Sequence, residues 1–316
     1  MITAESFEKF TVYKDSSSNS FLYADFNNPS RFMEGLAEYI LSEFNLLNYA
    51  NTLTPIPFSP TPQIYNKLYR TLGSFLNSEM EALTFDRVSN EVKTVLAEEY
   101  AFIDINGETR VQKDKIGKIG EYVLHLLLTN YYKVHCIIPK FRCTTDRNMS
   151  VFGIDALFFD PATGGLYFGE SKVCNTIDNA ITLINRSFAD YEEQISEEYK
   201  LVLSNDEAFK LSEEFLRAFQ HHTAVCITFQ DFLNVAGVKR IFVPAFLAHG
   251  NGDKDNDIEH FLNKMNTKLK KKRLFNLDTE YLFISLPIID KAKILEVIMK
   301  KVVQKSNEYR DALSAN

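Results

Sequence analysis

The sequence predicts an α/β fold, with a mixed sheet flanked by helices, because helical and extended patterns follow one another in its central part. Residues 115–132 have a helical apolar stripe, and three extended apolar segments follow, at 133–139, 150–160 and 166–173. Turn-forming residues at 160–165 join the last two segments, so these are expected to form a hairpin. The rest of the chain is arranged around this helix and its three strands.

Residues 1–110 are expected to form a mainly helical accessory region. Ser30 is a suitable N-cap for a helix in which apolar residues recur every four positions, and a proline-rich loop at 51–62 follows that helix. No catalytic constellation is found in this region, so it is expected to be an accessory layer, a partner-docking surface, or both. Its expected elements are strands at 7–13 and 21–26 and helices at 31–47, 63–77 and 79–100.

Residues 111–250 are expected to form the core of the fold, and residues 251–316 a C-terminal extension packed on it. Gly117 and Gly120 are costly inside the first core helix, and they make sense if backbone or substrate comes close there or if the first turn is irregular. The remaining expected elements are helices at 175–199, 208–220, 258–274 and 290–313 and strands at 224–229, 240–247 and 281–286.

Composition narrows the class of protein. The 316 residues are 45% hydrophobic, which is ordinary for a globular chain, and the net charge of −7 argues against coating nucleic acid by bulk charge. No apolar run reaches the ~20 residues that a membrane-spanning helix needs, and the N-terminus lacks the pattern of a signal peptide. None of the four cysteines has zinc-site spacing. We therefore expect a cytoplasmic protein that does not act at a membrane.

Four ionisable residues stand out against apolar surroundings: Glu121 on the expected helix, Asp155 on the second strand, and Glu170 and Lys172 on the third. Residues two apart on a strand point to the same face, so Glu170 and Lys172 are expected to project together. The hairpin should bring Asp155 beside Glu170. Two neighbouring carboxylates repel each other, and a divalent hard cation with oxygen ligands relieves that repulsion. A lysine beside such a cation can hold or polarise a water molecule.

This arrangement resembles the PD-(D/E)xK, or restriction-endonuclease-like, superfamily of nucleases. The shared pattern is a Glu on a helix, an Asp on a strand and (D/E)-x-K on the next strand. It is matched here by Glu121, by the segment GID that ends at Asp155, and by the segment GESK that ends at Lys172. The resemblance covers about residues 113–200. It implies a restriction-endonuclease-like core in which Glu121, Asp155 and Glu170 hold Mg²⁺ or Mn²⁺, and Lys172 assists a water that attacks a phosphodiester.

The whole chain, with a long region ahead of the nuclease motif, more narrowly resembles the HamA-like nuclease subunit of Hachiman anti-phage defence systems. These subunits are small bacterial proteins encoded beside a helicase. The resemblance implies a Mg²⁺-dependent deoxyribonuclease that acts on DNA together with a helicase-type ATPase subunit encoded nearby.

Basic residues around the expected site are candidate contacts for DNA phosphates. Two lie at the start of the helix that carries Glu121, two on the loop before the Asp155 strand, and five at the end of the helix expected at 258–274. Such runs of lysine are also found on ordinary solvated helix faces. The candidates are Lys115, Lys118, Arg142, Arg147, Lys268, Lys270, Lys271, Lys272 and Arg273.

Two other functions fit the same residues. A catalytically inactive nuclease-fold adaptor would keep the fold and bind a partner or DNA, although the intact Asp155, Glu170 and Lys172 argue against it. A stand-alone site-specific endonuclease or resolvase would carry the same motif. Magnesium-dependent nicking of a plasmid separates the nucleases from the adaptor. Cleavage of unrelated sequences separates a defence nuclease from a site-specific enzyme.

Overall fold

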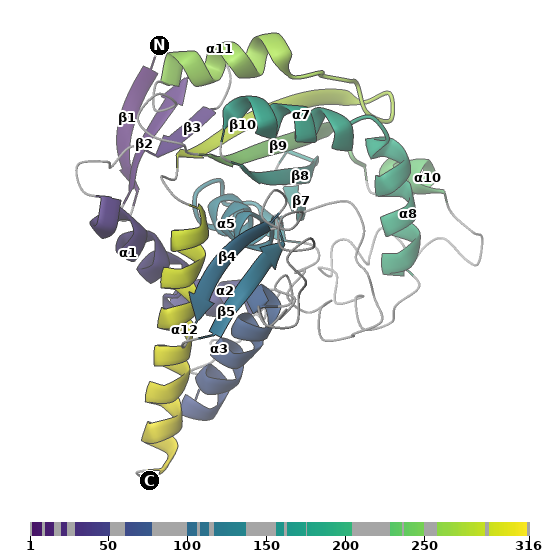
Figure 1. Ribbon diagram of the computed structural model, residues 1–316. Helices are drawn as coiled ribbons and strands as arrows, with labels where there is room; N and C mark the ends of the chain where they lie inside the picture. The colour runs from purple at the N-terminus through teal and green to yellow at the C-terminus, as the bar shows by residue number, and fades with distance from the viewer. Residues whose placement is uncertain are drawn as a thin grey trace, which may run out of the picture.

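In the computed structural model of the chain, helices lie on both faces of a mixed sheet, which confirms the predicted α/β class (Figure 1). The predicted helix at 208–220, most of the predicted helix at 79–100 and most of the predicted strand at 224–229 lie outside the described residues. The structure describes residues 2–7, 10–15, 20–23, 29–50, 61–77, 100–105, 108–113, 117–136, 156–160, 163–174, 176–203, 228–235, 237–249, 258–287 and 291–314.

The main sheet has eight strands among the described residues, and its four central strands are parallel. Antiparallel hairpins extend it on both sides, and the strands nearest the N-terminus continue the sheet that the central part of the chain builds. In order across the sheet, the strands are β1 (Ile2–Phe7), β2 (Phe10–Asp15), β3 (Ser20–Tyr23), β10 (Asp278–Pro287), β9 (Arg240–His249), β8 (Gly165–Cys174), β7 (Ala156–Asp160) and β6 (His135–Cys136). A separate two-stranded sheet pairs β4 (Tyr100–Ile105) with β5 (Glu108–Lys113).

The hairpin predicted at residues 160–165 is confirmed. β7 and β8 are antiparallel, and Asp160 pairs with Gly165 across the turn. Gly164 has a φ of +63°, which residues with side chains rarely adopt, so glycine suits this turn. Of the single strand expected at 7–13, residues 10–13 lie in β2, whereas Phe7 is the last residue of β1 and pairs with Phe10.

The central strand β9 is buried on both faces, as its apolar sequence predicts for a parallel strand covered by helices. Every residue from Ile241 to His249 is buried. Pro244 lies within this run and has no N–H to donate. The pairing of β9 with β8 is interrupted at this point and resumes where Ala245 pairs with Glu170.

Helices enclose an apolar core layer on each face of the sheet. α5 lies on one face with α1, α2, α3 and α12, whereas α7 and α11 lie on the other with α8 and α10 (Figure 1). The helices are α1 (Pro29–Ile40), α2 (Glu43–Ala50), α3 (Pro62–Asn77), α5 (Gly117–Asn130), α7 (Ile177–Ser187), α8 (Tyr191–Leu203), α10 (Phe229–Val235), α11 (Ile258–Lys268) and α12 (Lys291–Ser314). Among the described residues, no helix has both the length and the apolar character that crossing a membrane requires.

Three predicted helices end earlier than their apolar patterns suggest. The helix expected at 31–47 is divided into α1 and α2, and Ser42 Oγ accepts from the Asn45 N–H at 3.2 Å at the start of α2. The helix expected at 175–199 is divided into α7 and α8. The helix expected at 258–274 ends as α11 at Lys268, so the basic residues after it lie outside the helix.

Side chains from three other helices cap the C-terminal end of α1. The backbone carbonyls of residues 39, 40 and 41 accept hydrogen bonds of 2.7 Å from Asn45 of α2, Tyr122 of α5 and Tyr69 of α3, respectively. Asn130 of α5 donates in turn to Asn45 Oδ1, also at 2.7 Å. These carbonyls have no partner within α1, and the network supplies one for each. It ties the N-terminal helices to α5, although the division of the chain at residues 110 and 250 stays a prediction.

Gly120 is a point where α5 packs closely on β8, and the atoms nearest to it belong to side chains of β8. A Cβ at this position would lie 2.8 Å from Val173 Cγ2 and 3.3 Å from Ser171 Oγ. We predict that Gly120→Ala lowers the free energy of unfolding by about 1–3 kcal/mol because the added methyl group overpacks this contact. Gly35→Ala is the matched control, since nothing lies within 4 Å of a Cβ there.

The Gly35→Ala change should stabilise the chain by about 0.5–1 kcal/mol, because glycine is unfavourable inside a helix. Urea denaturation of both variants measures the two effects. A Gly120→Ala protein that unfolds at the same urea concentration as the unmodified chain would contradict the tight packing of α5 on β8.

Candidate active site

β8 brings Glu170 and Lys172 together, as predicted from their spacing. Lys172 Nζ donates to Glu170 Oε1 at 2.5 Å. The Glu170 side chain is only 1% exposed, whereas that of Lys172 is 25% exposed. The carboxylate is therefore inside the protein, and the ammonium group that compensates it still reaches the surface.

The surroundings of this ion pair are apolar. Glu170 and Lys172 lie in register with Ala245 and Leu247 of β9, and both of these are fully buried. Because side chains alternate along a strand, Glu170 and Lys172 point to the same face of the sheet as Leu166 and Phe168. These two residues pack in the core layer between the sheet and helices α7 and α11. A charge in such a position is costly unless it is paired, so the contact with Lys172 is part of what keeps the Glu170 carboxylate there.

Glu121 reaches this region from the opposite face of the sheet. It is half-buried on α5 and follows Gly120, which packs on Ser171 and Val173 of β8. Ser171 and Val173 point away from Glu170 and Lys172, because neighbouring strand residues alternate. Glu121 and the ion pair therefore approach β8 from opposite sides. Asp155, the fourth member of the predicted set, lies outside the described residues.

Carboxylate oxygens are the donors that Mg²⁺ prefers, so the chemical type of Glu121 and Glu170 suits a hard cation. Within the described ranges, no three His, Cys, Asp or Glu side chains are grouped as a metal site. A set of three carboxylates around Glu170 requires Asp155, and it stays a prediction.

A family model described as HamA matches residues 7–302, which is most of the chain. The chain belongs to the HamA family. This confirms the narrower resemblance seen in the sequence and makes the protein a component of Hachiman anti-phage defence. Comparisons with curated proteins and with solved structures gave no match.

The basic cluster of this HamA-family chain, Lys268 to Arg273, begins at the last residue of α11 and is exposed apart from the buried Leu269. Several of its side chains are engaged within the protein. Lys271 Nζ lies 4.7 Å from the centre of the Phe283 ring, and Lys272 Nζ donates to the Ala189 carbonyl at 2.8 Å. Of the other predicted DNA contacts, Lys115, Arg142 and Arg147 lie outside the described residues, and Lys118 lies on α5.

An ion pair that the sequence did not predict joins α7 to α11. Asp178, in the first turn of α7, accepts from Lys268 Nζ at 2.7 Å and from Lys264 Nζ at 2.9 Å. These hydrogen bonds, that of Lys268 first, hold the pKa of the Asp178 carboxyl below its ordinary value. The carboxylate therefore stays ionised at any pH near neutrality.

His249 and Ser285 form a second polar contact that sequence analysis missed. His249 Nε2 lies 2.7 Å from Ser285 Oγ, and both residues are fully buried. Leu247 of β9 pairs with Ser285 on one side and with Lys172 on the other. The His249–Ser285 contact therefore lies on the same face of the sheet as the Glu170–Lys172 ion pair. The one sequence signal is that a histidine ends the apolar run of β9.

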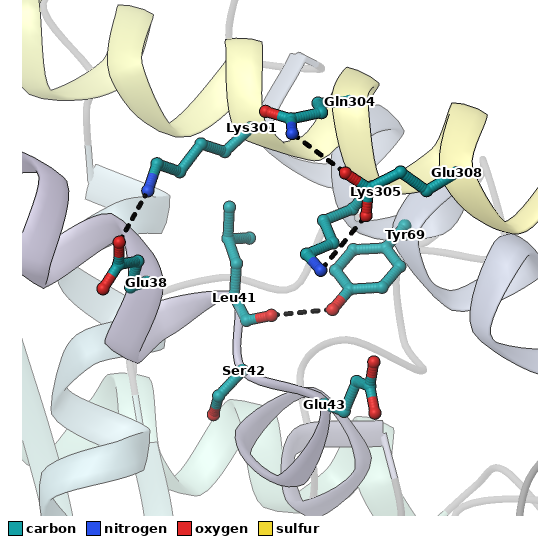
Figure 2. Close-up of a pocket in the computed structure, with 9 residues that line it drawn as sticks. All are labelled: Glu38, Leu41, Ser42, Glu43, Tyr69, Lys301, Gln304, Lys305 and Glu308. Carbon is teal, nitrogen blue, oxygen red and sulfur yellow. Dashed lines mark hydrogen bonds and ion pairs between the residues drawn. The ribbon is translucent and has the colours of Figure 1, made fainter.

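A pocket of about 470 Å³ lies among α1, α2, α3 and α12, away from the Glu170–Lys172 pair. Figure 2 shows the Glu38–Lys301 ion pair, at 3.2 Å, on one side of it and the Lys305–Glu308 pair, also at 3.2 Å, on another. Its walls are helix surfaces that carry both signs of charge, and it has no cluster of groups suited to catalysis. The pocket is accordingly a candidate for contact with another protein.

The Lys172–Glu170 pair gives a testable asymmetry in stability. Lys172→Met should lower the free energy of unfolding by about 2–4 kcal/mol, because it leaves a buried carboxylate without its nearest cation. Glu170→Gln should cost less, since the partly exposed Lys172 can turn to solvent. The cost of Lys172→Met should shrink as the pH falls toward about 4, where carboxyl groups gain a proton.

Chemical denaturation in EDTA measures these differences. Lys305→Met is the matched control, because the Lys305–Glu308 pair is exposed and should contribute less than about 1 kcal/mol. If Lys172→Met proved no more destabilising than Lys305→Met, the ion pair would not be what maintains Glu170 in its buried position.

Proposed function

We propose that the chain is a metal-dependent DNA nuclease that hydrolyses phosphodiester bonds as the effector of Hachiman defence. The observation that carries the proposal is the ion pair of Glu170 and Lys172 on the second strand of a hairpin. Their apolar surroundings make a purely solvated role for these charges a poor explanation. The fold that we propose for this part of the chain is the restriction-endonuclease-like core.

Asp155 and Glu170 are the proposed ligands of Mg²⁺ or Mn²⁺. Glu121, which the sequence predicts as a third ligand, lies on the helix that covers the other face of β8, and its part in the site stays a prediction. The chain order supports Asp155, because Asp155 directly precedes Ala156, and Ala156 pairs with Gly169, the neighbour of Glu170. Bound there, the cation would supply Lewis-acid stabilisation of negative charge on the phosphate. The carboxylates of the chain hold and orient that cation, and the buried position of Glu170 restricts water around it.

Lys172 has the proposed role of stabilising charge and positioning water. Its ammonium group touches Glu170 and also reaches the surface, so it can face a bound phosphate without leaving the carboxylate. Hydrolysis forms a bond from the water oxygen to phosphorus and breaks the bond from phosphorus to one nucleotide oxygen. A positive donor beside the phosphate favours the charge that develops in that step.

Cleavage assays test this function. The purified chain, with and without the product of the neighbouring gene, should nick supercoiled plasmids of unrelated sequence in Mg²⁺ but not in EDTA. Asp155→Asn, Glu170→Gln and Lys172→Met should each reduce the cleavage rate by roughly 100-fold or more. Lys239→Met, at the opposite end of the sheet, is the control and should cleave normally.

Failure of the unmodified protein to cleave any DNA under both conditions would favour the inactive adaptor instead. Cleavage confined to a single sequence would favour a site-specific endonuclease or a resolvase.

The partner that we propose is a helicase-type ATPase, docked on the N-terminal helices. Phe44 on α2 is 64% exposed, the most among the exposed large hydrophobic side chains of the described residues. It follows Glu43, which lines the charged pocket of Figure 2. An exposed aromatic residue beside a charged rim is typical of a protein-binding site.

Replacing this aromatic anchor tests the docking site. Phe44→Asp should reduce co-purification with the co-expressed ATPase at least tenfold, because the side chain would no longer bury apolar surface. Leu183→Asp is the control, since Leu183 is exposed at 36% on α7, on the other face of the sheet. Equal recovery of the complex with both variants would exclude Phe44 as the anchor.

A further inference from the structure

Lys264 and Lys268 of α11 share one carboxylate. Both ammonium groups donate to Asp178, each to a different oxygen, at 2.9 and 2.7 Å. The two lysines are four residues apart, so they lie on the same side of the helix. Asp178 is 47% exposed, and Lys268 is 56% exposed, so solvent and ions can reach the cluster. We call these three residues the Asp178 cluster.

The cluster has more positive than negative charge, and its neighbourhood adds to the excess. Two lysines face a single aspartate, and Lys270 and Lys271 are exposed a short distance along the chain. Lys270 also contacts α7, through a 2.8 Å hydrogen bond from its N–H to Asn185 Oδ1. A surface with this excess of positive charge attracts anions. The Asp178 carboxylate, which accepts from two ammonium groups, resembles a bound phosphate in its charge and in the placement of its oxygens.

The position of the cluster relates it to the proposed catalytic residues. α7 follows β8 in the chain and packs on the sheet face to which Glu170 and Lys172 point. α11 lies beside α7 on that face (Figure 1). A nucleic acid that reached Lys172 from this side would therefore find α7 and α11 next to it.

We propose that Lys264 and Lys268 bind a backbone phosphate of the substrate, and that Asp178 occupies their binding groups in the free protein as an internal competitor. This rests on the proposed function, which makes DNA the substrate. Phosphate displaces the carboxylate because both bind the same two ammonium groups. Asp178 therefore lowers the affinity for DNA in general and leaves sequence preference unchanged, since backbone contacts carry no sequence information.

A purely structural tie between α7 and α11 gives a different expectation. In that case removal of Asp178 would change thermal stability and would leave the affinity for DNA where it was. Exposed ion pairs contribute little to stability, so the affinity for DNA is the measurement that separates the two explanations.

The test is fluorescence anisotropy with a short labelled duplex and the full chain, in EDTA so that no cleavage occurs. Asp178→Asn and, as a second variant, Asp178→Ser should bind about three- to tenfold more tightly at low salt. Their log–log salt dependence should be steeper, because the same phosphate then meets two ammonium groups that no carboxylate partly neutralises. The double variant Lys264→Gln/Lys268→Gln should bind about tenfold more weakly with a flatter slope.

Two controls separate the cluster from bulk charge. Asp311→Asn removes one negative charge on α12, on the other side of the sheet, and Lys239→Gln removes one positive charge at the start of β9. Both should bind DNA as the unmodified chain does. If Asp311→Asn tightened binding as much as Asp178→Asn, or if the Asp178 variants left affinity unchanged, the proposal would be overturned.

Binding and cleavage are scored separately. An affinity that responds to Asp178 in a protein that never cleaves DNA would support this inference and refute the nuclease function. Mg²⁺-dependent cleavage by a protein whose DNA affinity is unchanged by substitution of Asp178, Lys264 and Lys268 would support the nuclease function and refute this inference.

Discussion

The burial of β8 on both faces is the constraint on which the rest of the structure depends. Every residue of this strand except Lys172 is buried, so a charge placed on it needs a partner at hand. Lys172 supplies that partner to Glu170 at 2.5 Å. Gly120 lets α5 close one face, and the helices that follow β8 close the other. The pairing of β8 with β9 is interrupted near Pro244 and resumes at Glu170. The buried charge therefore lies at the same point of the strand where the regular backbone pairing begins again.

The hydrogen bonds at the end of α1 connect the proposed docking surface to the proposed site. Tyr122, which donates to the carbonyl of residue 40, is the neighbour of Glu121 on α5. Each buried carbonyl left without a donor would cost about 1–3 kcal/mol, so the junction of α1 and α2 is firmly held. A partner bound at Phe44 on α2 would contact a helix whose start is fixed by the same network. A partner can influence Glu121 only through a continuous set of contacts, and the hydrogen bonds between α2, α1 and α5 provide such a set.

The sequence was sufficient for element types wherever periodicity was strong, and for the residues that share one strand. The β7–β8 hairpin and the common direction of Glu170 and Lys172 follow from turn chemistry and alternation alone. Helix breaks did not follow, because apolar residues such as Leu41 continue the periodic pattern through them. The pairing of His249 with Ser285 and of Asp178 with α11 was also out of reach. Those contacts depend on which strands and helices become neighbours, and spacing within one element carries no such information.

The two lysine sites show how a chain of net charge −7 could bind the DNA that we propose as its substrate. Lys172 is paired with a carboxylate that is almost inaccessible to solvent, so water and salt screen the attraction between the two charges only weakly. Lys264 and Lys268 are paired with a carboxylate that is about half exposed, where ions compete and the net contribution is small. The same chemical pairing therefore has opposite consequences in the two places. At β8 it holds a proposed catalytic group inside the protein, and at α7 it leaves the cations available to the phosphate that we propose they bind.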